Sequence, residues 1–378
     1  MRNLFYNLNF LFVLALVILL PSCAKKKNAE ELQGSAIIAY IEGGKSLDAS
    51  KINASKVTHI NYAFAQIKDG KAYFADESVD VENIKKLNEL KASNPNLRVL
   101  VSVAAKDWSK SFDETPLTDE ASKSFAKSVA DIVKANNLDG IDINWGYPLA
   151  SDLKEVANIS GLSQSFIKAI ASVKEELNAL EKETDKAYTL SCAVETDTNY
   201  IANTGMKDAQ QYLNFINVIV YNFLDAKIAI HQANLYPSDK YQIRKAASVA
   251  IQDYINSGVS PEKLVLGIPF YGNVYKVKKD SQTGIGDPVV EKTGTRGYTF
   301  IKDSLINQKE YFRYWDNEAQ APYVYNYYNS TLVTYNDEES VKAKCQYVKD
   351  NDLAGVMFWE YNSDPKGFLL DAINQILK

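Results

Sequence analysis

Residues 138–148 read LDGIDINWGYP, and this stretch decides the fold. From Ile141 to Gly146, apolar and polar or small residues alternate with the period of a β-strand. The preceding run, Ser122 to Asn136, has its apolar residues at helical spacing. A helix that leads into a short strand with a polar end is typical of parallel β/α folds, in which the carboxyl ends of the strands carry the chemistry.

The same unit, a mostly apolar strand and then a helix, recurs along the chain. Strands are predicted at 35–41, 57–67, 96–104, 138–145, 187–194, 214–223, 263–271 and 353–360. Helices are predicted at about 79–93, 118–137, 159–183, 239–257, 337–351 and from 364 to the end. This alternation predicts a (β/α)8 TIM barrel. Spacing alone also allows an open doubly wound sheet, but no glycine-rich phosphate loop favours it.

One connection is far longer than the others. About 80 residues, Asn273 to Asp352, separate the seventh and eighth predicted strands, and a connection of that length should contain structure of its own. It holds four glycines and two aromatic runs, Tyr311–Trp315 and Tyr323–Tyr328. We therefore expect a small α+β insertion over about 273–335.

The stretch DGIDINWG resembles the DGxDxDxE signature of glycoside hydrolase family 18, the chitinases and endo-N-acetylglucosaminidases. Asp139, Gly140 and Asp142 match the signature, Asn144 replaces its middle Asp, and Gly146 replaces its proton-donating Glu. The segments THINYAFA, KLVLGIPFYG and GVMFWEYNSD are also similar to parts of that family, in the same order. The resemblance covers nearly the whole mature chain.

The resemblance implies a sugar site at the carboxyl ends of the barrel strands. In that family the Glu protonates the leaving oxygen, the substrate's own acetamido oxygen attacks the anomeric carbon, and the middle Asp and a Tyr hold the acetamido group. The positions that would contact a glycan are Asp142, Asn144, Tyr221, Asn222, Tyr40, Phe64 and Trp359, with Trp108 as either a ligand contact or a packing residue.

Two departures from the signature decide the expected function. Gly146 has no proton to donate, and Asn144 is neutral and cannot stabilise positive charge as a carboxylate does. We therefore expect a catalytically degenerate member that binds N-acetylglucosamine-containing glycans, with no catalytic residue of the signature's pair intact. Two alternatives stay open: an active glycosidase that uses a substitute acid such as Glu195, and a protein-interaction scaffold.

Composition restricts the ligands. A formal charge of −5 and the absence of a basic run beyond the N-terminus argue against nucleic acid. The 24 Tyr and 4 Trp suit a surface that is half apolar and half wet, such as a sugar cleft. With 2 His and 3 Cys, we expect no zinc or iron site and no cofactor. Cys192 and Cys345 are expected to be separate buried thiols, and the protein a monomer.

The N-terminus is predicted to be an export signal. An apolar run from Leu8 to Leu20 follows Arg2 and is too short for a typical membrane span. The following LPSC resembles a bacterial lipobox with Cys23 as the lipidated residue, although a plain cleaved signal with a chance Cys is the alternative. We expect a signal over 1–22, a tether over 23–34, the barrel over 35–378, and location in a Gram-negative outer membrane, on either face.

Overall fold

The computed structural model describes residues 34–104, 117–144, 159–278 and 284–378, and the side chains of 159–162 lie outside the description. The described residues from Gly34 to Lys378 belong to one compact unit. The predicted signal and Cys23 lie outside the described residues.

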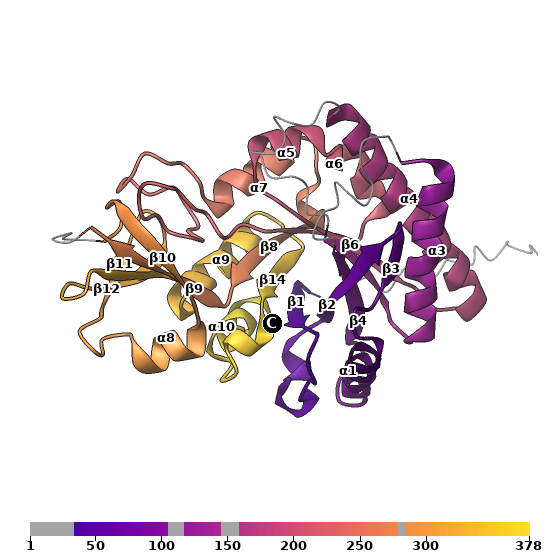
Figure 1. Cartoon of the computed structure of the whole chain (residues 1–378), viewed down its shortest axis with the longest axis horizontal. Coiled ribbons are helices and arrows are strands. Elements are labelled where there is room, and N and C mark those ends of the chain that lie inside the picture. The colour runs from indigo at the N-terminus through magenta and orange to yellow at the C-terminus, as the bar shows by residue number, and fades with distance from the viewer. Residues whose placement is uncertain (1–33, 105–116, 145–158, 279–283) are drawn as a thin grey trace, which may run out of the picture. The chain divides into compact units, whose positions relative to one another are not determined.

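Eight parallel strands form a closed barrel (Figure 1). They are β1 (Ala36–Glu42), β2 (His59–Lys68), β4 (Arg98–Ala104), β5 (Gly140–Asn144), β6 (Thr189–Val194), β7 (Phe215–Val218), β8 (Leu264–Pro269) and β14 (Gly355–Trp359). Closure comes from β1, which pairs in parallel with both β2 and β14. The short β3 (Lys71–Tyr73) adds to β2 in antiparallel orientation. This confirms the predicted TIM barrel and excludes the open sheet.

Helices follow the strands and pack outside them. The main ones are α1 (Glu77–Glu89), α3 (Asp119–Ala135), α4 (Ile159–Thr184), α7 (Ala247–Asn256), α9 (Glu338–Asp350) and α10 (Phe368–Leu377), with two short ones, α5 (Thr198–Asn203) and α6 (Met206–Ala209). In Figure 1, α1, α3 and α4 lie on the outer side of β2, β4 and β5. Among the described residues, no helix combines the length and apolar character that crossing a bilayer requires.

Strand alternation divides the apolar residues into two layers. Outward-facing residues such as Ile37, Ile60 and Val101 join the helices in the large core. Inward-facing ones, among them Ile38 and Val265, form a second, smaller cluster inside the barrel. Because the period of a strand is two, every inward polar residue is brought into this small interior, and that is how the candidate site is built.

The insertion between β8 and β14 is a five-stranded antiparallel sheet with one helix, at the left of Figure 1. It comprises β9 (Tyr271–Val277), β10 (Val289–Gly297), α8 (Tyr298–Ser304), β11 (Phe312–Asp316), β12 (Ala321–Asn326) and β13 (Thr331–Thr334). The predicted aromatic runs are β11 and β12. The sequence interpretation did not resolve β9, because its alternation continues that of β8 with only Phe270 between them.

The strand predicted at 214–223 is wrong in its second half. β7 ends at Val218, and the amide of Val220 donates to the carbonyl of Val218, which turns the chain. Asn222 then adopts a left-handed conformation with φ of 59°, which breaks the extended run. The helix predicted from 239 likewise begins only at Ala247, so a long irregular segment lies between them at the carboxyl end of the barrel.

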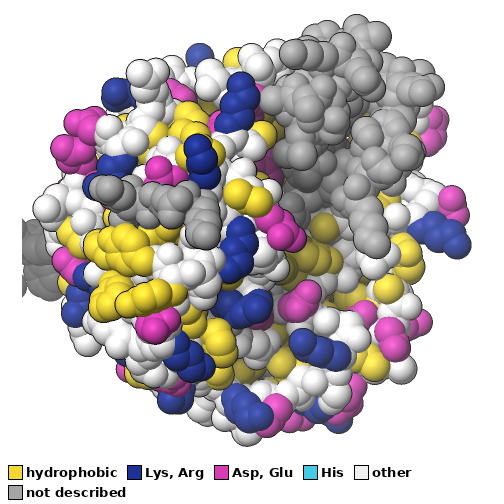
Figure 2. All heavy atoms as spheres, turned by 60° about the vertical axis from the view of Figure 1, so that its left-hand side comes forward, with side chains coloured by type: hydrophobic (Ala, Val, Ile, Leu, Met, Phe, Trp, Pro, Cys, Tyr) yellow, Lys and Arg dark blue, Asp and Glu magenta, His cyan; other side chains and the backbone are white. Residues whose placement is uncertain are grey.

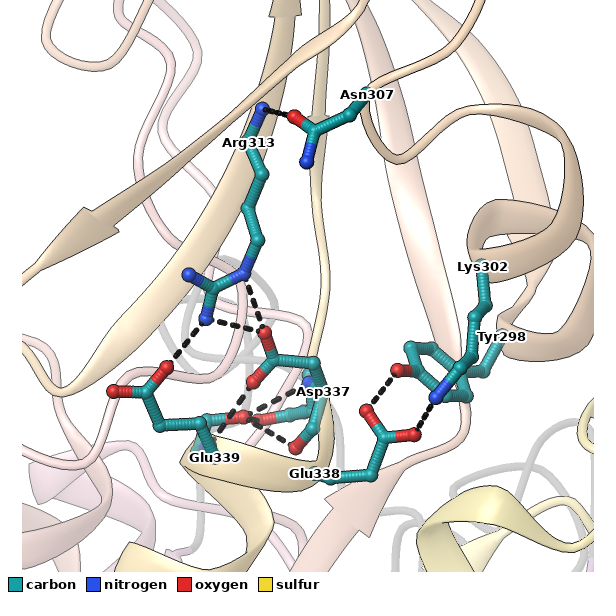
Figure 3. Close-up of polar contacts among 9 residues, drawn as sticks. Tyr298, Lys302, Asn307, Arg313, Asp337, Glu338 and Glu339 are labelled. Atoms are coloured by element: carbon teal, nitrogen blue, oxygen red, sulfur yellow. Dashed lines mark hydrogen bonds and ion pairs between the residues drawn. The ribbon is translucent and has the colours of Figure 1, made fainter.

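A polar clasp, defined here as Arg313, Asp337, Glu338, Glu339 and Lys302, joins the insertion to the barrel (Figure 3). From β11, the guanidinium of Arg313 donates to Asp337 Oδ2 at 2.9 and 2.6 Å and to Glu339 Oε2 at 2.7 Å. Lys302 of α8 pairs with Glu338. Because Asp337 also caps the N-terminus of α9, the clasp fixes the insertion against a barrel helix.

Replacing Arg313 with Lys is expected to lower the free energy of unfolding by about 1–2 kcal/mol, because an ammonium cannot reproduce the forked contact with two carboxylates. Urea unfolding measures the loss. The control is Lys127→Gln in the exposed Lys127–Asp131 pair, where we expect a change within about 0.5 kcal/mol. An Arg313→Lys variant as stable as the parent would mean that the clasp does not hold the insertion.

Candidate functional site

The carboxylate of Asp142 lies fully buried inside the barrel and accepts four hydrogen bonds. Tyr40 Oη and Ser102 Oγ donate to Oδ2 at 2.9 and 2.7 Å. Ser191 Oγ and Asn217 Nδ2 donate to Oδ1 at 2.7 and 3.1 Å. The four donors come from β1, β4, β6 and β7, so this one side chain on β5 connects five strands.

Four donors and no acceptor around Asp142 suit a carboxylate, which can only accept hydrogen bonds. Burial raises the pKa of Asp142 above its ordinary value, although the bonds from Ser102, Ser191, Tyr40 and Asn217 lower it part of the way. Asn217 also donates to Tyr40 Oη at 3.0 Å, which fixes the direction of the phenol's own proton toward Asp142. The interior is thus arranged around one negative charge.

Of the two replaced signature positions, the structure describes Asn144, which lies beyond Asp142 toward the carboxyl end of β5. Asn144 ends β5 and is partly buried, in register with Ala193 of β6. Gly146, which stands where the signature has its proton donor, lies outside the described residues, as does Trp108.

The first Asp of the signature, Asp139, has a structural role away from the interior in which Asp142 lies. Asp139 lies at the opposite end of β5 from Asn144 and accepts from the amide of Val99 at 2.7 Å. Its carboxylate pairs with Lys91 at 2.5 Å and with Lys186 at 2.8 Å. Asp139 therefore links the amino end of the barrel and lies at the opposite end of β5 from the candidate site.

Gly140, the second residue of the signature, is required by a close approach. A Cβ built on Gly140 would lie 2.0 Å from the carbonyl oxygen of Thr189 on the neighbouring strand. Any side chain here would force β5 and β6 apart. The matching start of the signature is thus explained by the fold, so its retention carries no information about catalysis.

Three aromatic side chains, one each from β1, β2 and β14, pack against one another at the barrel mouth. Phe64 stacks on Trp359 with ring centroids 5.5 Å apart and planes 14° apart. Tyr40 lies against Trp359 at a centroid distance of 5.9 Å and a 50° tilt. Trp359 is partly buried, and the residues that line the neighbouring pocket include it.

A pocket of about 450 Å³ lies between Trp359 and the insertion. It is lined by Asn222, Leu224, Tyr271, Asn273, Lys292, Thr295, Gly297, Trp359, Glu360 and Ser363. Tyr271 Oη donates to Asn222 Oδ1 at 2.7 Å across it. The side-chain amide of Asn273 is buried beside the phenol of Tyr275. Aromatic faces next to exposed amide and hydroxyl groups suit a ligand that is partly apolar and partly polar.

Glu195 directly follows β6 at the same end of the barrel. It is partly buried, and its carboxylate has no hydrogen-bond or ion-pair partner among the described residues. Burial raises the pKa of Glu195 above its ordinary value. Burial also raises the pKa of Tyr221 well above 10, and the nearby Tyr271, Glu195 and Asp142 add to that shift.

The predicted glycan contacts separate into two sets. Phe64, Asn144, Asn222 and Trp359 retain exposed surface, and Tyr221 lies at the boundary with 8% exposure. Tyr40 and Asp142 were predicted as contacts but are 2% and 0% exposed. The barrel alternation directs both side chains to the axis, below the more exposed set, and their predicted glycan contact stays a prediction.

Sequence interpretation missed the donors Ser102, Ser191 and Asn217. A signal was present for the last of them, since Asn217 is a polar residue two strand periods before Tyr221. The pocket residues of the insertion, such as Tyr271 and Asn273, were missed because β9 was not recognised as a separate strand.

The histidines and cysteines behave as core residues. His59 is buried and hydrogen-bonds through Nδ1 to Thr58 at 2.8 Å, and burial lowers its pKa to about 4. His231, which the sequence left without a role, is buried against Asp316 at 3.1 Å. Cys192 and Cys345 are separate buried thiols, as predicted. Within the described ranges, no group of three or more potential metal ligands is found.

Comparison with known proteins gives consistent matches. A family model described as glycosyl hydrolases family 18 matches residues 36–364. Chitinase A1 of Niallia circulans is 29% identical over 93% of this chain, which spans 60% of that protein's length.

Solved structures also match. A family 18 N-acetylglucosaminidase from Paenibacillus barengoltzii has 30% identity and a TM-score of 0.80, covering 90% of this chain and 99% of its own. Human YKL-39, described as a pseudo-chitinase with retained chitooligosaccharide binding, shares the fold at 22% identity with a TM-score of 0.76, over 90% of this chain and 99% of its own.

Replacing Asp139 with Asn is expected to lower the free energy of unfolding by about 2 kcal/mol near neutral pH, because it leaves two partly buried ammonium groups unpaired. Burial alone would raise the pKa of Asp139, but Lys186, Lys91 and the amide of Val99 together hold it below its ordinary value. The stability it supplies is therefore present above the unfolded-state pKa and is lost as pH falls through the lowered folded-state pKa.

The pH dependence of this difference is the decisive readout. Urea unfolding of the Asp139→Asn variant and the parent should give stabilities that converge in acid. A difference that persisted unchanged in acid would show that the variant perturbs packing and not charge. Asp131→Asn, in the exposed pair with Lys127, serves as the matched control.

Proposed function

Because the chain belongs to glycosyl hydrolase family 18, we propose that it binds N-acetylglucosamine-containing glycans at the carboxyl end of its barrel without hydrolysing them. The proposal rests on a contrast: the hydrogen bonds that support the site are present, but the two replaced signature positions lack the catalytic groups. Asp142 keeps four donors in place below the site, whereas position 144 holds a neutral amide and position 146 a glycine. General acid catalysis contributes roughly 10²–10⁴-fold, and glycine cannot supply it.

The glycan class follows from the relatives and agrees with the aromatic groups at the site. Niallia circulans Chitinase A1 and the Paenibacillus barengoltzii N-acetylglucosaminidase are named for N-acetylglucosamine polymers or units. The stacked Phe64 and Trp359 and the exposed amide of Asn222 offer the apolar faces and hydrogen bonds that such sugars need.

Surface charge also favours a ligand without a high charge density. Figure 2 turns the insertion toward the viewer and shows Lys and Arg side chains interspersed with Asp and Glu, and hydrophobic side chains gathered on its left-hand part. A surface of this mixed kind does not produce the strong single-sign field that attracts polyanions.

We also propose that the protein is exported and anchored to a membrane through lipid on Cys23. The support is the apolar run followed by LPSC and the polar tether after it. Mass spectrometry of the purified protein tests this: a diacylglyceryl or triacyl Cys23 at the N-terminus is expected, and an unmodified chain that retains residues 1–22 would overturn it.

Calorimetric titration of the purified chain with chitotetraose, followed by sizing of the recovered sugar, tests the proposed function. Saturable heat with intact tetraose is the expected result. Shortened sugar would instead favour an active glycosidase, for which the desolvated and unpartnered Glu195 is the candidate acid, and turnover lost in Glu195→Gln would establish it. The absence of both binding heat and sugar cleavage would contradict the assignment of a glycan ligand.

Replacing Trp359 with Ala should weaken chitotetraose binding about tenfold or more, because truncating a central aromatic anchor commonly costs at least 1.4 kcal/mol. Titration measures the change. Tyr328→Ala is the control, since Tyr328 is 79% exposed on the turn after β12 and does not line the pocket. Equal affinities for the two variants would remove Trp359 from the binding site.

Restoring both signature residues tests whether the site retains its geometry. The double variant Asn144→Asp with Gly146→Glu regains a proton donor and a charge stabiliser, and we expect weak hydrolysis of chitotetraose over hours. The single variant Asn144→Asp is the control and should stay inactive, since it lacks the acid. A folded, glycan-binding double variant with no turnover would show that the reacting bond lies out of reach.

A further inference from the structure

Glu195 follows β6 at the barrel mouth, and its carboxyl group has no side-chain partner among the described residues. Ser191 faces the barrel axis, as its bond to Asp142 shows, and the two-residue period brings Ala193 and then Glu195 to the same side. The ladder is intact up to Val194, the residue before Glu195, whose carbonyl accepts from the amide of Ile219. The alternation therefore directs the side chain of Glu195 toward the barrel axis, on the same side as Ser191.

Among the described residues, none of the side chains that face inward near the mouth from β5, β6 and β7 is a cation. They are Asp142, Asn144, Ser191, Ala193 and Asn217, with Tyr221 following the end of β7. The phenol of Tyr254 donates to the backbone carbonyl of Glu195 at 2.6 Å and not to its side chain. Desolvating a carboxylate without a partner is costly, and covering it further with a neutral ligand adds to that cost.

Only one kind of group on the ligand could pair with this carboxylate as a cation. An N-acetylated hexosamine glycan is neutral, so it can meet a carboxylate only with hydroxyl or amide donors. Loss of the acetyl group exposes an amine on carbon 2, which is the one group of such a glycan that can become a cation, and a neighbouring carboxylate favours its protonated form. A charge-assisted hydrogen bond from an ammonium to a carboxylate is about twice as strong as a neutral one.

We propose that Glu195 is a specificity-determining residue that selects glycans containing de-N-acetylated glucosamine, through an ion pair with the 2-ammonium group. This inference rests on the proposed glycan-binding function and refines its ligand from a fully acetylated to a partly deacetylated chain. It also accounts for the coexistence of a neutral Asn144 with a nearby carboxylate, since an ammonium is bound by a fixed negative charge and needs no proton donor.

The experiment compares two tetramers on the purified full chain: chitotetraose and its fully de-N-acetylated counterpart. The expected result is tighter binding of the amino tetramer, by about tenfold or more, and a collapse of that preference in Glu195→Gln, which keeps the shape and removes the charge. Asp197→Asn is the control. Asp197 is an exposed carboxylate two residues away that caps α5, a role Asn also fills, so the preference should persist.

The other possible outcomes show whether the ion pair, the glycan binding or both are wrong. Chitotetraose bound as tightly as the amino tetramer, or a preference that survives Glu195→Gln, overturns the ion pair and leaves the proposed glycan binding intact. Binding of neither tetramer overturns both proposals. Cleavage of either tetramer that vanishes in Glu195→Gln overturns the ion pair and makes Glu195 an acid.

Discussion

The buried charge of Asp142 is the interaction on which the barrel interior depends. Its four donors come from four other strands, and each donor has its proton directed at that carboxylate. Removing the charge would leave buried hydroxyl and amide donors without acceptors, which costs more than the net value of the bonds themselves. Asp142 would therefore be kept for the fold even in a chain with no use for its chemistry, so its presence says little about turnover.

The sequence predicted the barrel well because its signals are local and repeated. Eight apolar strands recur, six of them followed by a predicted amphipathic helix, and each pair indicates the same architecture. The end of β7 was missed because Tyr221 and Phe223 continue an apolar alternation, whereas the left-handed Asn222 that breaks it leaves no mark in that pattern. The start of the insertion was missed for the same reason, since β9 continues β8 with only Phe270 between them.

The sequence predicted at which end of the barrel the candidate site lies, but not how deeply each of its side chains is buried. Resemblance placed Tyr40, Asp142, Tyr221 and Trp359 at one end of the barrel, and the structure brings them together. It could not say that Tyr40 and Asp142 are buried, because burial depends on which neighbours close over a side chain. Nor could it identify Asn273, whose position against Trp359 arises only when β9 folds back over the mouth.

The replacement of the proton donor by glycine changes whether a second carboxylate can be tolerated nearby. In a hydrolase, a second uncompensated acid close to the reacting bond would compete for the proton and shift the acid's pKa. Once position 146 is glycine, that constraint disappears, and a carboxylate such as Glu195 can persist at the mouth without disturbing any proton transfer. Its cost of desolvation then remains unless a ligand supplies positive charge. Under the proposed function, the substitution that removes the signature's proton donor also makes charge-based selection among hexosamine glycans possible at this end of the barrel.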